Sequence, residues 1–214
     1  MKKGLFITIE GPDGSGKSTV SKVLVERLTA MGINVLHTRE PGGIEIAEQI
    51  RNVILDPKNT SMDARTEALL YAASRRQHLV EKVIPAIKQK KLVLCERFVD
   101  SSLAYQGYAR KLGEKNIWKI NDFAIEDHMP ELTIYLDIDE KKGLKRIETR
   151  ASKDRLDVES VKFHHNVVKG YKEVVEKNKR RIKVVNADQD VESVINDCMK
   201  VITKYLYDKG YIKK

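Results

Sequence analysis

The chain has 214 residues, 41% of them hydrophobic and 33% charged, and its formal net charge is +9 at pH 7. This length suits one α/β domain, 1–214, with a full hydrophobic core. No apolar run is long enough to span a membrane, and the first strand is expected so early that no room remains for a signal peptide. We therefore expect a cytoplasmic protein with no membrane partner.

The positive charge is concentrated towards the end of the chain. Residues 1–140 hold 20 basic and 20 acidic residues, so the whole excess lies in residues 141–214. This excess is spread along helical patterns, as on solvated helix faces, and aromatic residues that stack on bases do not alternate with it. We expect no nucleic-acid partner.

Cys95 and Cys198 are expected to be reduced thiols that fill space.

Strand-like and helical patterns alternate along the chain. Apolar, β-rich runs predict five strands, at 5–10, 33–38, 92–95, 132–137 and 182–186. Helical patterns predict helices at 18–31, 44–55, 64–90, 101–111, 115–128, 140–150, 158–178 and 191–207. Pro85 is expected to kink or split the third helix. Strands that alternate with helices predict an α/β fold, a five-stranded parallel sheet with helices on both faces.

The first strand runs directly into a phosphate-binding motif. Residues 11–18, Gly-Pro-Asp-Gly-Ser-Gly-Lys-Ser, fit the P-loop pattern G-x-x-x-x-G-K-[ST] at every position. Because a helix is predicted to follow, backbone N–H groups should converge on a phosphate at its positive end, and glycines permit the close approach. Lys17 is expected to reach the β and γ phosphates of ATP, and the Ser18 hydroxyl to bind Mg²⁺. The predicted ATP-binding residues are Gly11, Pro12, Asp13, Gly14, Ser15, Gly16, Lys17, Ser18 and Thr19, with Asn186 after the fifth strand.

Charged residues follow two further strands. Residues 39–43 read Arg-Glu-Pro-Gly-Gly, and residues 96–102 read Glu-Arg-Phe-Val-Asp-Ser-Ser. The carboxyl ends of parallel strands meet at one edge of a sheet, where ligands bind. Arginine and carboxylate at that edge suit Mg²⁺ and polyphosphate. A GTPase is not expected, because no N-K-x-D tetrad follows a strand, and a motor or AAA-type ATPase is typically longer.

Five segments taken together resemble the bacterial thymidylate kinase family, whose fold is of the P-loop kinase type. They are residues 10–18, 39–43, 71–76, 96–107 and 154–157, and they run in the family's order over nearly the whole chain. The runs Arg-Glu-Pro-Gly-Gly and Ser-Leu-Ala-Tyr-Gln-Gly are far more specific than the P-loop. The resemblance implies phosphorylation of dTMP to dTDP with Mg²⁺ and ATP, in dTTP biosynthesis, by a homodimer.

The resemblance also implies which residues hold the phosphate of dTMP. Arg97 would bridge that phosphate and the transferring group, because the guanidinium fork grips phosphate oxygens bidentately. Glu40, Pro41 and Arg51 would line the pocket of the acceptor phosphate. Arg51 also has the position of a surface charge on a helix, which is the usual place for arginine.

A second set of residues is implied to recognise the nucleoside. Arg75 would contact thymine, and Tyr71 would stack on its ring, although its helical spacing also fits a packing residue. Ser102 and Gln106 would hydrogen-bond the edges of the base. Tyr105 would crowd the position of a ribose 2′-hydroxyl, which explains a preference for deoxyribose by steric exclusion.

A short polar stretch between two predicted helices is expected to be a mobile lid, at about residues 150–157. The P-loop of this chain carries no arginine, so the resemblance implies that the lid supplies a catalytic cation. Arg150, Lys153 and Arg155 are available, and Arg150 and Arg155 are predicted to be catalytic together with Lys17 and Arg97. A lid arginine that reaches the transferring phosphoryl group is worth ~10³-fold or more in rate.

Glu96 is a departure, because the family usually has aspartate there. We expect it to bind Mg²⁺ through water, alongside Ser18 and Asp13. Glutamate followed by arginine also occurs in deoxynucleoside kinases, where the acid takes the proton of a 5′-hydroxyl. A deoxynucleoside kinase is therefore an alternative. A nucleic-acid-stimulated ATPase that uses the basic C-terminal third is a second one.

Overall fold

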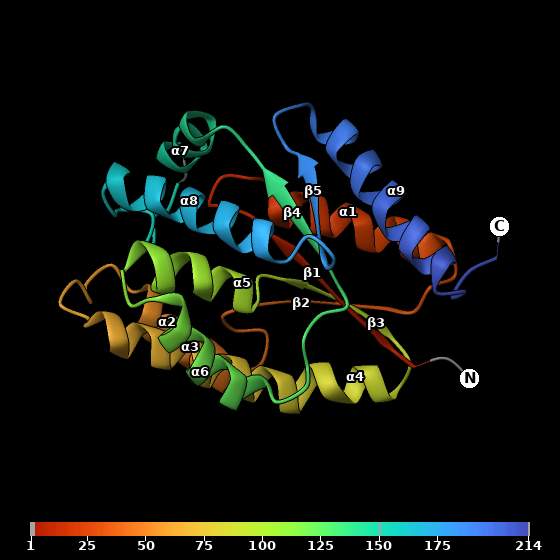
Figure 1. The fold of residues 1–214 in the computed structure, drawn as a ribbon, viewed down its shortest axis with the longest axis horizontal. Helices are drawn as coiled ribbons and strands as arrows, with labels where there is room; N and C mark the ends of the chain where they lie inside the picture. The colour runs from red at the N-terminus through yellow and green to blue at the C-terminus, as the bar shows by residue number, and fades with distance from the viewer. Residues whose placement is uncertain (1–2, 150, 214) are drawn as a thin grey trace.

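The computed structural model describes residues 3–149 and 151–213 and is built around a five-stranded parallel sheet (Figure 1). The strands are β1 (Leu5–Glu10), β2 (Val35–Arg39), β3 (Leu92–Glu96), β4 (Leu132–Asp137) and β5 (Ile182–Asn186). Their spatial order is β2-β3-β1-β4-β5, and every neighbouring pair is parallel. The predicted sheet is confirmed.

The burial of each strand follows its place in the sheet. All residues of β1 and β3, the strands at the centre, are buried, which fits their nearly continuous apolar sequences. β5 lies at an edge and exposes Lys183, Val184 and Asn186. In the register, Glu96 lies opposite both Ile9 and Arg39. The ends of β1, β2 and β3 are therefore level, so the segments that follow them meet at one edge.

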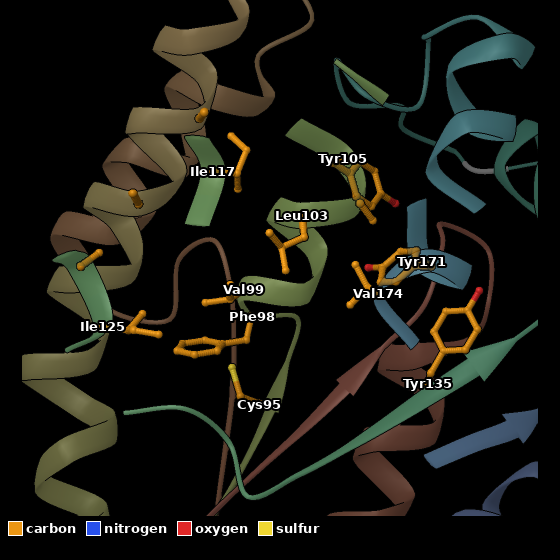
Figure 2. Packing of buried hydrophobic residues seen from close by; sticks show 14 of the residues in the cluster. Cys95, Phe98, Val99, Leu103, Tyr105, Ile117, Ile125, Tyr135, Tyr171 and Val174 are labelled. Carbon is orange, nitrogen blue, oxygen red and sulfur yellow. The ribbon is translucent and has the colours of Figure 1, made fainter. Parts of the chain in front are cut away.

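Helices cover both faces of the sheet (Figure 1). One face packs against α1 (Lys17–Ala30) and α9 (Val191–Asp208) through side chains such as Ile7 and Leu94. On the other face, Phe6 and Val93 pack in a second core, formed with the remaining helices. Figure 2 shows Phe98 of this core between Ile125 and Cys95. The other helices are α2 (Glu45–Leu55), α3 (Ala64–His78), α4 (Ile84–Lys88), α5 (Val99–Ser102), α6 (Glu114–Ile125), α7 (Glu140–Glu148) and α8 (Val161–Lys177).

Two predicted helices contain π-helical turns. In the helix predicted for 64–90, η1 (Leu79–Val83) lies between α3 and α4 just before Pro85, so the helix changes type there without a break. Proline lacks an N–H and its ring crowds the carbonyl four residues earlier, so a wider turn relieves both problems. The helix predicted for 101–111 begins earlier, as α5, and continues as η2 (Leu103–Ala109). This second π-helix carries two of the predicted site residues.

The helix predicted for 158–178 begins three residues late, at Val161. The side chain of Ser160 accepts a hydrogen bond from the backbone N–H of Phe163 at 3.2 Å and so caps the helix. Residues 151–160 therefore lie outside α8, and two of them, Asp154 and Leu156, line the cavity described below.

The described part of the chain has no helix that is both long and apolar enough to cross a bilayer. Cys95 and Cys198 are free and buried. Burial raises the pKa of the Cys198 thiol to about 12, and burial likewise raises the pKa of Cys95. Both thiols are therefore neutral and unreactive under physiological conditions.

Candidate active site

A cavity of about 420 Å³ opens at the carboxyl end of the sheet. Its P-loop wall consists of Asp13, Gly14, Gly16, Lys17, Ser18 and Thr19. Its helical wall comes from the end of β2 and from α2, α3, α5 and η2, and consists of Arg39, Glu40, Pro41, Arg51, Leu55, Tyr71, Ser101, Ser102, Tyr105 and Gln106. Glu96 and Arg97 lie between the two walls, and Arg146, Asp154 and Leu156 complete the lining.

The P-loop has backbone angles that need glycine. Gly14 has a φ of 79° and Gly16, which precedes α1, has a φ of 87°. A Cβ atom on Gly14 would lie 2.3 Å from the carbonyl oxygen of Gly143 in α7, so the loop is packed tightly against that helix. The loop thereby presents backbone N–H groups at the start of α1, where the helix dipole favours an anion.

The Lys17 ammonium lies inside the P-loop. It donates to the carbonyl oxygens of Gly11 and Pro12 at 3.0 and 2.8 Å. Burial, and then the nearby charge of Arg97, lower its pKa to about 7. An arriving phosphate would add negative charge beside the ammonium, and so would hold the proton on Lys17.

The structure brings together two of the three predicted metal ligands. The Ser18 hydroxyl donates to the Glu96 carboxylate at 2.7 Å. The other carboxylate oxygen of Glu96 lies 3.0 Å from Nε2 of His37. Burial raises the pKa of Glu96, but the hydrogen bonds from His37 and Ser18 outweigh it and hold the pKa below its usual value. The pair is therefore an ionised, oxygen-rich corner beside the P-loop.

Asp13, the third predicted metal ligand, contacts Arg97 and Tyr105 in this structure. One carboxylate oxygen accepts from Arg97 at 2.5 Å, and the other accepts from the Tyr105 hydroxyl at 2.6 Å. Within 3–149 and 151–213, no group of three or more His, Cys, Asp or Glu side chains could hold a metal ion. The Asp13 carboxylate holds the arginine that lies between the two walls, and its predicted contact with the metal stays a prediction.

Arg97 is held between the walls by its backbone and its side chain. It follows β3 with a φ of 65°, an unusual angle for a residue other than glycine. Its guanidinium lies 5.1 Å from the centre of the Tyr105 ring and donates to the hydroxyls of Ser101 and Tyr171 at 3.2 and 3.3 Å. A cation on a strained backbone at the edge of a cavity is typical of a functional residue.

A buried carboxylate supports the turn that carries Arg97. Glu10 accepts from the backbone N–H of Phe98 at 2.6 Å and from the hydroxyls of Ser101 and Tyr171 at 2.6 and 2.9 Å. Burial, and then the charge of Asp100, raise the pKa of Glu10 to about 7. Glu10 therefore fixes the turn without itself facing the cavity.

Glu40 of the helical wall is part of a buried ion-pair network that extends behind the wall. Its carboxylate accepts from Nε of Arg75 at 2.7 Å and lies 3.1 Å from Nδ1 of His78. Arg75 is itself 2% exposed and does not line the cavity; it donates to the Ser102 hydroxyl at 3.1 Å. Its predicted contact with a base stays a prediction, but its contact with Ser102 links it to the wall.

Four other residues predicted for the acceptor nucleotide line the cavity. Arg51 donates to the Pro41 carbonyl at 2.9 Å, and burial, followed by the charge of Arg39, lowers its pKa. Tyr71 is half-buried beside them. The Gln106 amide donates from Nε2 to the buried Glu67 at 2.8 Å. The structure thus gathers Arg51, Tyr71, Tyr105 and Gln106 at one wall.

The structure contradicts the prediction that Arg155 is a lid cation for the phosphates. Arg155 is 5% exposed, and its guanidinium donates to the Ile54 carbonyl at 2.7 Å and to Glu67 at 2.6 Å. A charge this well paired inside the protein anchors the 151–160 segment to α2 and α3. Arg150, the other predicted lid cation, lies outside the described residues.

Several predicted ATP-binding residues do not line the cavity. Gly11, Pro12 and Ser15 support the P-loop from within, since the first two bind Lys17. Asn186 is exposed at the end of β5 and accepts from the backbone N–H of Asp188 at 2.8 Å. Its predicted contact with ATP stays a prediction.

The prediction missed several residues in and around the site, among them Arg146, Asp154 and His37. Arg146 on α7 lines the cavity and donates to the Gly14 carbonyl at 3.0 Å. Asp154 lines the cavity too, and burial raises its pKa. His37 supports Glu96. The sequence signal for Arg146 was its position on the helix after β4, but the face that meets the P-loop is decided by packing.

Comparison with known proteins gives one consistent result. The family model described as thymidylate kinase matches residues 9–198. A thymidylate kinase of Oceanobacillus iheyensis is 54% identical over 208 residues, which cover 96% of this chain and 92% of that protein. One of Clostridium novyi is 56% identical over 199 residues, covering 92% and 97%. The crystal structure of thymidylate kinase from Ehrlichia chaffeensis is 35% identical, with a TM-score of 0.77, covering 94% of this chain and 99% of that one.

Proposed function

The chain belongs to the thymidylate kinase family, and we propose on this premise that its cavity holds ATP and dTMP together. The enzyme is a phosphotransferase that phosphorylates dTMP with ATP, which gives dTDP and ADP for dTTP biosynthesis. The observation that carries our placement of the reaction is Arg97, a cation held between a phosphate-binding loop and a wall of side chains.

The reaction needs charge and alignment more than proton transfer. A phosphate oxygen of dTMP forms a bond to the γ-phosphorus of ATP, while the bond from that phosphorus to the bridging oxygen breaks and ADP leaves. The attacking phosphate is already anionic at neutral pH, so no general base is required. We assign Lys17 to the β and γ phosphates of ATP, and Arg97 to the acceptor phosphate and the transferring group.

The Ser18 and Glu96 pair fits Mg²⁺. Hydroxyl and carboxylate oxygens are ligands that this ion prefers, and Glu96 is kept ionised by its hydrogen bonds. Ser18 would bind the ion directly and Glu96 through water, with ATP supplying phosphate oxygens. Bound there, the ion offsets the negative charge of the phosphates. His37 then serves to orient the Glu96 carboxylate.

The helical wall is assigned to dTMP. Arg51 and Glu40 flank the acceptor phosphate with Pro41, while Tyr71 stacks on the base and Ser102 and Gln106 bond to its edge. Tyr105 is held on Asp13 beneath Arg97, and its ring crowds the 2′ position of the sugar. A ribose hydroxyl would collide with this ring, so deoxynucleotides are preferred.

We assign the lid to about residues 150–157, with its far end anchored by Arg155. The cation that faces the phosphates from this side is then Arg150 or Arg146, of which Arg146 already lies against the P-loop. Closure over bound nucleotides would exclude water and so limit hydrolysis of ATP.

A homodimer is proposed from the apolar side chains on three neighbouring helices. Phe123 on α6 is 88% exposed and Leu69 on α3 is 56% exposed, and Ile46 and Val53 of α2 are also exposed. Burial of such residues against a second copy removes them from water. Sedimentation at micromolar concentration is expected to give twice the chain mass of 24.5 kDa. A monomer would contradict this proposal. The free, buried thiols of Cys95 and Cys198 support our proposal of a cytoplasmic protein.

The decisive experiment compares acceptors in an assay of ADP release with Mg²⁺ and ATP. The purified protein is expected to turn over dTMP and to leave thymidine unchanged. Turnover of thymidine in place of dTMP would instead support the deoxynucleoside kinase alternative, which the comparisons do not favour. ATP hydrolysis that rises with added DNA and falls with salt would support the other alternative.

A further inference from the structure

A buried glutamate behind the cavity contacts the residue assigned to the edge of the base. Glu67 on α3 is fully buried. One of its carboxylate oxygens accepts from Nε2 of Gln106 at 2.8 Å. The other accepts from Arg155 at 2.6 Å and from Arg110 at 3.0 Å. Among the described residues, the hydrogen-bond partners of the Glu67 carboxylate are thus all donors.

The two arginines determine the charge of Glu67. Burial raises the pKa of this carboxyl, but the hydrogen bonds from Arg110, Gln106 and Arg155 outweigh burial and hold the pKa below its usual value. A carboxylate without its proton can only accept hydrogen bonds. Any group that faces Glu67 must therefore present a donor.

This requirement fixes the orientation of the Gln106 amide. An amide carries one NH₂ group and one carbonyl oxygen, and rotation by half a turn exchanges them. Because Glu67 accepts only, the NH₂ group must face it, and Oε1 points the other way. Gln106 lines the cavity, and no residue in the described ranges donates to its Oε1. The helical wall therefore offers a carbonyl acceptor to the cavity.

An acceptor at this place distinguishes between pyrimidines. The Watson–Crick edge of thymine has one donor, N3–H, between two carbonyl acceptors. N3 of cytosine carries a lone pair instead of a hydrogen, so it would face the lone pairs of Oε1. Ser102 already accepts from Arg75, so its hydroxyl hydrogen remains available for a carbonyl of the base. The wall therefore complements thymine and repels cytosine.

We propose that Glu67 is a specificity-determining positioning residue, which makes the site select pyrimidines with an N3–H by locking the Gln106 amide. This inference rests on the proposed function, in which Gln106 contacts the base. Glu67 touches no substrate itself. Its neutral counterpart glutamine has both a donor and an acceptor, so in Glu67→Gln the Gln106 amide is able to turn and offer NH₂ to cytosine.

The test compares kcat/KM for dTMP and for dCMP in the wild type and in Glu67→Gln. The ratio is expected to fall about tenfold in the variant, the size of effect that one hydrogen bond produces. dUMP keeps N3–H, so the dTMP-to-dUMP ratio is expected to stay within about twofold. A purely structural defect would lower kcat/KM for dTMP, dCMP and dUMP by the same factor and leave both ratios unchanged.

Glu159→Gln is the matched control. Glu159 pairs with Arg110 at 2.6 Å in the same cluster, so this variant removes the same charge without touching Gln106. Its dTMP-to-dCMP ratio is expected to match the wild type. If Glu67→Gln is too unstable to assay, Glu67→Gln with Arg110→Gln removes one charge of each sign and the same fall is expected.

Two results overturn the inference. One is a dTMP-to-dCMP ratio in the Glu67 variants that equals the wild-type ratio. The other is an equal fall in Glu159→Gln, which would trace the effect to charge alone. If the wild type turned over no dTMP at all, the proposed function would fail first, and the inference with it. Turnover of dTMP with an unaltered ratio would remove only the inference.

Discussion

The two walls of the cavity are built in different ways. The P-loop wall presents backbone N–H groups and one lysine, and its shape depends on glycines such as Gly14. The helical wall presents side chains that buried carboxylates hold in place: Glu67 holds Gln106 directly, and Glu40 pairs with Arg75, which donates to Ser102. A phosphate is the same in every nucleotide and is well held by backbone groups. A base is recognised by directional groups, which need a second layer to orient them.

The largest effect is expected where the walls meet. Arg97→Ala removes the cation that both phosphates share, so kcat should fall ~10³-fold or more, as for other arginines at a transferring phosphoryl group. ATP affinity should change little, because Lys17 and the loop remain. The measurement is kcat together with ATP binding by calorimetry. Arg27→Ala is the control, since Arg27 pairs with Glu192 on the far face. An unaltered kcat would remove Arg97 from the site.

The next largest effect is expected from the buried layer. Glu40→Gln breaks an ion pair whose two side chains are each 2% exposed and leaves Arg75 with an uncompensated charge. Loss of one partner from such a pair costs about 3 kcal/mol of the free energy of unfolding. Urea unfolding measures it, with the exposed Glu192→Gln as control. Equal stability of the two variants would show that Glu40 does not support the wall through Arg75.

A smaller, one-sided effect is expected in the P-loop wall. Gly14→Ala places a methyl group against Gly143 and strains the loop, so KM for ATP should rise about tenfold. KM for dTMP should stay near that of the wild type, because the helical wall is untouched. Steady-state kinetics with each substrate varied in turn separates the two. A parallel rise in both KM values would mean that the walls are not independent.

The smallest effect is a pH dependence of ATP binding. The pKa of Lys17 is about 7 in the free protein and should rise when phosphates bind, so binding takes up a proton above pH 7. The affinity should therefore weaken about fivefold from pH 7 to pH 8. Calorimetry in buffers of different ionisation enthalpy detects the proton. Lys17→Arg should remove the dependence, and a pH-independent wild type would show that Lys17 is charged throughout.

The sequence predicted the two walls unequally, for a physical reason. The P-loop is local: the residues that bind phosphate lie next to one another, and the glycines that shape the loop lie among them. The sheet was also predictable, because its strands read as apolar runs. The buried layer joins distant residues, since Glu67 and Arg155 are 88 positions apart. A single sequence does not show such pairs.

This difference explains the errors as well. Arg155 is a cation in a polar stretch, as expected of a lid residue. Only its hydrogen bond to the buried Glu67 shows that its side chain points into the protein. The pairing of Asp13 with Arg97, which directly follows β3, was likewise not visible in the sequence. Arg146 was missed because its helix was predicted without its orientation. In each case the chemistry of the side chain was read correctly, and its partner was unknown.

The most direct test of the account is the affinity of a bisubstrate ligand, thymidine and adenosine joined by a chain of five phosphates. If the two walls hold two nucleotides end to end with Arg97 between them, this ligand should bind at least a hundredfold more tightly than ATP or dTMP alone, because the second half binds without a further loss of translational freedom. Calorimetry measures it directly. An affinity no greater than that of ATP would contradict the account.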